Sequence, residues 1–186
     1  LENKKTFTIG GSGHFIMQFL RQCRHVLIPI WAFSIGLGVE ELGLIQSISA
    51  ALDMTLFYPV GLIMDKFGRK WTSVPSIILL SSGFIFMTYV DTFTGLMIVG
   101  LLLGFANGLG SGAMLTLGSD LSPKKQPGSF LGIWRLFGWS GNSAGGPISG
   151  AVAQTLGNTA SALSVSTIGV IGVIIFTFLL PETLKE

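Results

Sequence analysis

The chain of 186 residues is poor in charge: 11% of its residues are charged, 49% are hydrophobic, and the net charge is +2. Because a soluble domain carries about 25% charged residues, this composition and a mean hydropathy of +0.68 predict a membrane protein. The small net charge argues against nucleic-acid binding. A single cysteine, Cys23, excludes an internal disulfide and a cysteine-cluster metal site, and we expect no metal and no cofactor. The chain starts at Leu1, and we expect it to be a piece of a larger membrane protein.

Six membrane spans are predicted from the long stretches that lack charged side chains. About 20 apolar residues are needed to cross a hydrocarbon core of roughly 30 Å, and residues 71–90 and 92–119 have that length. Residues 136–181 are also uncharged, but as one helix they would be about 69 Å long. We therefore expect a turn at Leu156-Gly157-Asn158 to divide them. The predicted spans are 16–38, 42–65, 71–90, 93–118, 128–155 and 159–180.

The basic residues give the expected orientation. With six spans, ten of the eleven Lys and Arg residues fall at one face: Lys4, Lys5, Arg21, Arg24, Lys66, Arg69, Lys70, Lys124, Lys125 and Lys185. The opposite loops carry only Glu40, Glu41 and Asp91. The positive-inside rule then places both termini in the cytoplasm. We expect a multi-pass protein of a plasma membrane, of the bacterial inner-membrane type.

A cluster of charge, GLIMDKFGRK at residues 61–70, follows the second predicted span. Its spacing, Gly61-x-x-x-Asp65-x-x-Gly68-Arg69-Lys70, resembles the loop signature of the major facilitator superfamily, and it occupies the loop where that family has it. The fifth span carries Gly141-x-x-x-Gly145-Gly146-Pro147-x-x-Gly150, which is similar to that family's glycine–proline motif of antiporters. The closing Leu180-Pro181-Glu182-Thr183 also resembles the family.

This resemblance implies an all-α membrane fold, namely the C-terminal six-helix half of a twelve-helix transporter. The implied partners are the lipid bilayer, a missing N-terminal six-helix half, a small-molecule substrate and protons. On this basis we expect proton-coupled efflux by alternating access, and residues 1–186 alone are expected not to transport. Proton-coupled uptake by a symporter, or a six-helix scaffold or sensor that does not transport, are the alternatives.

The charged turn itself is predicted to act as a conformational latch. Gly61 and Gly68 permit a tight, close-packed reversal of the chain, and Asp65 is expected at the N-terminus of a neighbouring helix. Arg69 is a bidentate donor, and its best local partner is Asp120 at the end of the fourth span. The alternative interpretation of the turn is a positively charged anchor on a solvated loop.

Two charged residues lie inside predicted spans. Asp53 is about 18 Å from the charged turn, where a carboxylate costs roughly 2.5–3.5 kcal/mol and points to function. We expect Asp53 to couple protons or to bind a cationic substrate; the alternative is a structural hydrogen bond to another span. Arg135, about 10 Å deep, either extends to the membrane interface or binds an anion in a cavity. Its depth does not favour direct pairing with Asp53.

Glycines recur every fourth residue along the fourth span, at Gly100, Gly104, Gly108 and Gly112. This spacing predicts close helix packing, with a second role in bending. Polar and aromatic residues on the first, second, fourth and fifth spans are candidates for lining a cavity, although each also fits a helix contact or an interface anchor. These candidates are Trp31, Ser34, Gln46, Asn107, Trp139 and Asn142.

An enzymatic function finds little support in the sequence. Gly138-Trp139-Ser140-Gly141 matches the G-x-S-G motif of intramembrane serine proteases, whose serine needs a histidine as general base. The only histidines, His14 and His25, precede Ser140 and are expected at the cytoplasmic start of the first span. No phosphate-binding loop for ATP hydrolysis occurs. We therefore expect no enzyme.

Overall fold

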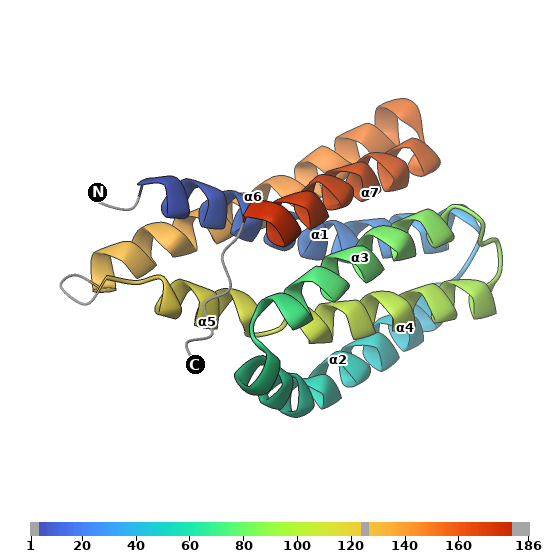
Figure 1. The fold of residues 1–186 in the computed structure, drawn as a ribbon. Helices are drawn as coiled ribbons and strands as arrows, with labels where there is room; N and C mark the ends of the chain where they lie inside the picture. Colours follow the sequence, from blue (N-terminus) through green and yellow to red (C-terminus); the bar gives the residue numbers. More distant parts are fainter. Residues whose placement is uncertain (1–3, 124–126, 180–186) are drawn as a thin grey trace.

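The computed structural model describes residues 4–123 and 127–179, which form helices joined by short turns (Figure 1). No strand occurs within these two ranges, in agreement with the expected all-α fold. The closing motif Leu180-Pro181-Glu182-Thr183 lies outside the described residues. The helices are α1 (Lys4–Ser34), α2 (Val39–Phe67), α3 (Lys70–Met87), α4 (Phe93–Gly110), α5 (Ala113–Asp120), α6 (Pro127–Leu156) and α7 (Asn158–Ile174), followed by the π-helical turn η1 (Ile175–Leu179).

Four helical stretches of the described chain are long and apolar enough to cross a membrane. They are Val39–Phe67, Lys70–Met87, Phe93–Asp120 and Asn158–Leu179. The helices α1 and α6 have the length to cross but fall outside this set, because polar residues interrupt their apolar sequence. The count of six spans therefore stays a prediction.

The first helix begins at Lys4 rather than near residue 16. Arg21 and Arg24 were expected at the cytoplasmic end of the first span, and this is wrong. They lie about 26 Å and 30 Å along α1 from its first residue, in the middle of the bundle. His14 and His25 also lie inside α1 rather than at its start. A start signal for the helix was missed because residues 4–15 are polar and glycine-rich.

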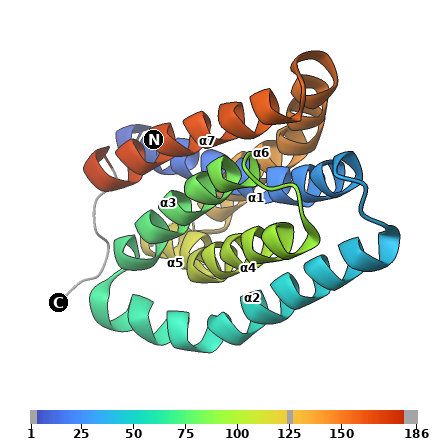
Figure 2. The ribbon, with the colours of Figure 1, turned by 90° about the vertical axis from the view of Figure 1, so that its right-hand side faces the viewer.

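Each helix of the bundle packs mainly against one or two others. α1 packs mainly against α6, whereas α4 packs against both α2 and α3, and α7 packs against α3 and α6 (Figures 1 and 2). The turns from α1 to α2, α3 to α4 and α6 to α7 lie at one end of the bundle, and the α2–α3 turn lies at the other (Figure 1).

The contact between α2 and α4 depends on glycine. A Cβ atom added at Gly104 would lie 2.5 Å from the backbone oxygen of Ser49, and one added at Gly100 would lie 2.8 Å from a side-chain carbon of Ile45. Gly108 faces α2 as closely, 2.7 Å from a leucine side chain. No larger residue fits at these distances without a shift of one helix. The glycine stripe therefore packs α4 on α2, as the small-residue spacing predicts.

Gly112 departs from this stripe and interrupts the fourth predicted span. Its φ of +79° is a left-handed conformation that glycine adopts without strain. α4 ends at Gly110 and α5 begins at Ala113, so the expected single helix over 93–118 is two helices with a break. The bending role expected for this stripe falls on Gly112.

The glycine–proline motif of α6 is divided in the same way. Added Cβ atoms at Gly141 and Gly145 would meet the backbone of α1, at Gly145 2.8 Å from a backbone oxygen. Gly146 makes an ordinary contact with α1, and Gly150 has open space around it. Pro147 lies inside the helix. Gly141 and Gly145 thus pack α6 closely on α1, whereas Gly150 faces open space.

Substitution of Gly104 by alanine should destabilise the protein, because the new Cβ would overlap the backbone oxygen of Ser49. Overpacking of this kind costs about 1–3 kcal/mol. The measurement is the thermal unfolding midpoint in detergent, compared with Gly43→Ala on the exposed face of α2, where nothing lies within 4 Å. Equal midpoints for the two variants would contradict the proposed contact.

Candidate functional site

A buried charge cluster lies where α1, α2 and α4 meet. It consists of Arg21 and Arg24 from α1, Asp53 from α2 and Asn107 from α4. Arg24 Nη2 lies 3.9 Å from Asp53 Oδ2, and the two side chains are only 7% and 13% exposed. Asn107 Nδ2 donates a hydrogen bond to the same carboxylate oxygen. Asp53 therefore pairs with Arg24 and Asn107. Among the described residues it forms no ion pair with Arg135, in agreement with the different depths of the two side chains.

Backbone oxygens of α4 hold the two arginines in place. Arg24 Nη1 donates to the oxygen of Leu103 at 3.2 Å, and Arg21 Nη2 donates to the oxygen of Asn107 at 3.0 Å. The last four carbonyls of a helix lack a backbone donor one turn on. Asn107 is one of these, because α4 ends at Gly110. The negative end of the α4 dipole also favours a cation at this position.

The cluster holds two guanidinium groups and one carboxylate, so it carries a net positive charge. Asp53 Oδ1 and Arg21 Nε are both buried and have no hydrogen-bond partner among the described residues. Burying an ion pair is costly, and its members become strongly destabilising if one of them loses its partner. The cluster is therefore sensitive to the charge on Asp53.

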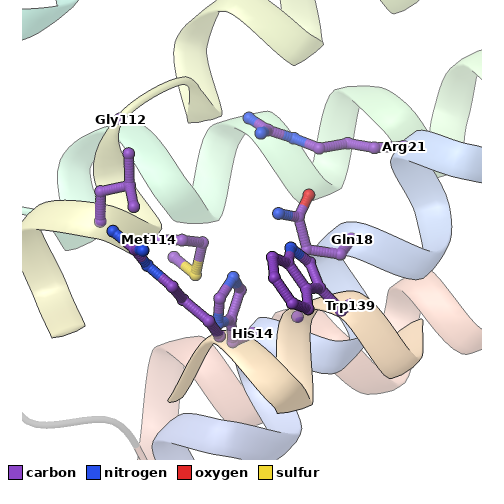
Figure 3. Close-up of a pocket in the computed structure, with 9 residues that line it drawn as sticks. His14, Gln18, Arg21, Gly112, Met114 and Trp139 are labelled. Atoms are coloured by element: carbon purple, nitrogen blue, oxygen red, sulfur yellow. The ribbon is translucent and has the colours of Figure 1, made fainter. Parts of the chain in front are cut away.

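A cavity of about 290 Å³ opens beside Arg21 (Figure 3). Three segments line it: α1, the junction between α4 and α5, and α6. The lining residues are His14, Gln18, Arg21, Gly112, Met114, Leu115, Arg135, Gly138 and Trp139. The lining contains two guanidinium groups and no carboxylate. The break at Gly112 shapes one wall, because the chain leaves the axis of α4 there.

Trp134 on α6 contacts two residues that line this cavity, Met114 and His14. Its Nε1 donates to the backbone oxygen of Met114 at 2.9 Å, and its ring stacks on that of His14 with 5.0 Å between centroids. His14 Nδ1 lies 3.1 Å from the backbone oxygen of Trp134. Because a carbonyl only accepts, we assign the imidazole proton to Nδ1. His14, Gln18 and Arg21 were not predicted as cavity residues, although their spacing on one helix face marks them.

The sequence-predicted cavity residues fall into three groups. Asn107 belongs to the charge cluster, and Trp139 lines the cavity. Trp31 is buried and donates from Nε1 to the backbone oxygen of Val90 at 2.8 Å, and Ser34 bonds back to Trp31; both are helix contacts.

Gln46, half-buried on α2, and Asn142, exposed on α6, lie outside the lining of this cavity. Arg135, expected either at the interface or in the cavity, is exposed to solvent in the described chain and lines the cavity.

The charged turn lies at the C-terminal end of α2, and its contacts connect α2, α3 and α5. Arg69 Nε donates to Asp120 Oδ2 at 2.9 Å, and Nη1 donates to the backbone oxygen of Met64 at 2.8 Å. The pairing of Arg69 with Asp120 expected from the sequence is thus present, and it joins the α2–α3 turn to the end of α5. Lys70 Nζ reaches the backbone oxygen of Thr177 at 3.2 Å.

Two expectations for the turn are wrong in the described chain. Asp65 is 76% exposed, and its partner is Arg69 Nη1 at 3.7 Å rather than the N-terminus of a neighbouring helix. Gly61 lies within α2 with nothing within 4 Å of an added Cβ, so it makes no close-packed contact. Gly68, with φ of +99°, makes the reversal by itself.

Residues 11–186 match the family model of the Major Facilitator Superfamily. No significant match is found among curated proteins. Among solved structures, the chain is similar to the crystal structure of the human organic anion transporter MFSD10 (TETRAN), with a TM-score of 0.72 and 16% sequence identity. The alignment covers 98% of this chain and 48% of that chain, so this chain spans about half the length of that structure.

At this identity the structural likeness shows the fold alone, and the family match carries the assignment. That match extends over nearly the whole chain, and the fold is that of one half of a transporter. Together they account for the charged turn, the glycine-rich helix contacts and the apolar composition. This protein belongs to the major facilitator superfamily and is an integral, multi-pass membrane protein.

Proposed function

We propose that residues 1–186 form the C-terminal half of a secondary active transporter that moves a small solute by alternating access, coupled to protons. The ion pair between Arg24 and Asp53 is the observation that carries this proposal. A second six-helix half would complete the central pathway. Both termini would lie on the cytoplasmic side of a plasma membrane of bacterial type. Lipid surrounds the apolar helices.

Asp53 is the proposed site of proton uptake. Its Oδ1 is buried without a hydrogen-bond partner among the described residues, while Oδ2 is held by Arg24 and Asn107. A proton on Oδ1 would neutralise the carboxylate and remove its attraction for Arg24, which keeps its bond to α4. The contact of α2 with α1 would then loosen while α1 stays attached to α4. Loss of the proton restores the pair.

The charged turn is proposed to stabilise one conformation at the cytoplasmic face. Arg69 joins the α2–α3 turn to Asp120 at the end of α5, and α5 is separated from α4 by the left-handed Gly112. Gly112 is the proposed pivot about which α5 would move when the contact with Arg69 breaks, a motion that would also strain the hydrogen bond from Trp134 to Met114. Rocking of the two halves around a central site requires such a reversible contact.

The direction of transport has two candidates. The resemblance of the α6 motif to that of antiporters favours efflux. The net positive charge beside Asp53 favours uptake of an anion together with a proton, because each negative ligand makes protonation of the carboxylate less costly. In liposomes, an inward proton gradient would drive solute out in the first case and in with the proton in the second.

Asp53→Asn in the complete reconstituted protein should reduce pH-gradient-driven transport at least tenfold. Asparagine has the size of aspartate, but its amide binds no proton at the pH of a transport assay. Exchange of labelled for unlabelled solute without a gradient should persist, because exchange needs no release of the proton. Glu40→Gln, which removes an exposed carboxylate on the same helix outside the cluster and the charged turn, is the matched control. Unchanged gradient-driven transport in Asp53→Asn would refute the proposed coupling.

Asp120→Asn should weaken the cytoplasmic contact with Arg69 and increase exposure of the cavity from that side. Partly exposed ion pairs are worth about 0.2–1 kcal/mol, so we expect up to a few-fold faster labelling of Leu115→Cys by a membrane-impermeant maleimide. The native Cys23 is buried and serves as the background. Asp91→Asn in the α3–α4 turn is the control. The latch role fails if Asp120→Asn and Asp91→Asn give the same labelling rate.

Residues 1–186 expressed alone should insert into membranes but show no solute flux in proteoliposomes, because the opposite wall of the pathway is proposed to come from the second half. The measurement compares flux from this chain with that from the complete protein at equal amounts. Co-expression with the separate second half should restore flux. Flux from residues 1–186 alone would overturn the half-transporter proposal.

A further inference from the structure

We infer that the cavity between α1, the α4–α5 junction and α6 binds a small organic anion, namely a carboxylate attached to an aromatic or other flat apolar body. The inference rests on the proposed transport function in that this anion would be the transported solute. The argument comes from the charges, the unused donors and the apolar walls of this one cavity.

The charge of the lining selects an anion. Arg21 and Arg135 approach the cavity from two different helices, α1 and α6, and no carboxylate is among the lining residues. The one nearby carboxylate, Asp53, is shared between Arg21 and Arg24 and contacts Arg24 directly, so an excess positive charge remains. Two guanidinium groups around one cavity repel a cationic solute and attract an anionic one, most strongly where water is scarce.

Arg21 has donors that its protein contacts do not use. Its Nη2 donates to the backbone oxygen of Asn107, while Nε is buried and has no partner among the described residues. A buried donor without a partner is costly and rare in proteins. A carboxylate oxygen in the cavity would supply the acceptor once the side chain of Arg21 turns Nε toward it. The planar guanidinium pairs with a carboxylate through two parallel hydrogen bonds.

The backbone at the junction of α4 and α5 adds to this preference. Gly112, Met114 and Leu115 line the cavity at the start of α5. The N–H of Leu115 already donates to the backbone oxygen of Gly112, and the positive end of the helix dipole favours an anion here. Because α5 is a short helix, its dipole contributes little beside the charges of the two arginines.

The remaining walls describe the body of the solute. Trp139 is 66% exposed and Leu115 is 62% exposed, and Met114 lies beside them. A flat apolar group would cover these side chains, with the indole ring of Trp139 as a stacking surface. The volume of about 290 Å³ lies at the lower end of the range for small-molecule sites. The geometry therefore points to a carboxylate with one or two rings.

The test is equilibrium binding of three matched probes to the complete protein purified in detergent. The probes are 1-naphthoate, its neutral alcohol 1-naphthalenemethanol and its cationic analogue 1-naphthylmethylammonium. We expect saturable binding of 1-naphthoate that is at least tenfold tighter than that of either analogue. Equal or tighter binding of the cation, or no saturable binding of 1-naphthoate, would overturn the inference. Full competition by equimolar chloride or phosphate would also overturn it, because it would show a site for inorganic anions.

Arg135→Gln should weaken binding of 1-naphthoate about tenfold, and Arg135→Lys should retain part of the affinity. Arg135 is exposed, so its substitution leaves the buried cluster intact, whereas Arg21→Gln would threaten folding. Lys66→Gln, which removes an exposed cation stacked on Phe67 outside the cavity, should bind as the unsubstituted protein does. Unchanged affinity in Arg135→Gln would contradict the assigned site.

Binding needs no gradient, so this experiment separates the two proposals. Binding of 1-naphthoate without transport would leave the anion site standing and remove the transport function. Gradient-driven transport of another solute by a protein that does not bind 1-naphthoate would leave the transporter standing and remove the anion site.

Discussion

The close approach of α4 to α2 is the contact on which the rest of the structure depends. Glycine at positions 100, 104 and 108 lets the two backbones come near enough for Asn107 to reach the carboxylate of Asp53. A side chain at Gly104 would push α4 away from Ser49 and break that bond. Arg24 then bridges α1 to both helices, because it faces the Asp53 carboxylate and a backbone oxygen of α4. Packing by small residues thus creates a polar centre inside an apolar bundle.

The end of α4 at Gly110 has two consequences for the site. It leaves the oxygen of Asn107 without a backbone donor, and Arg21 uses it. It also turns the chain into α5, whose first residues form one wall of the cavity. A continuous helix over the same residues would give that oxygen a backbone donor and would close that wall. The glycine at position 112 therefore acts on the electrostatics of the site as well as on the shape of the bundle.

The parts of the structure that depend on local pattern were predictable from the sequence. The glycine stripe, the turn at Gly157, the all-α fold and the contact of Arg69 with Asp120 follow from spacing and from which residues end the spans. The position of Arg21 and Arg24 did not follow. They were interpreted as membrane-interface charges because the first helix was started too late, and glycines near residues 10–13 hid its true beginning. Helix contacts decide their place: carbonyls of α4 and a carboxylate of α2 compensate charges that the sequence alone leaves unpaired.

Asp65 is a residue whose contact the family pattern did not predict. Its place in the loop signature suggested a helix N-terminus as partner, yet its side chain is exposed next to Arg69. A pattern shared with a family can therefore indicate where a residue lies without fixing what it contacts within one half.

The charges around Asp53 also constrain how a proton and a solute act on each other. Protonation of Asp53 would leave two guanidinium groups without a carboxylate, and an anion beside Arg21 would offset that excess charge. Anion binding and protonation then favour each other, and this coupling is reciprocal by thermodynamic necessity. A cationic solute would instead compete with the proton for the same carboxylate, as antiport requires. Asp53 already contacts Arg24 and Asn107, so in the proposed transporter its surroundings fit co-transport of an anion with a proton better than exchange of a cation for one.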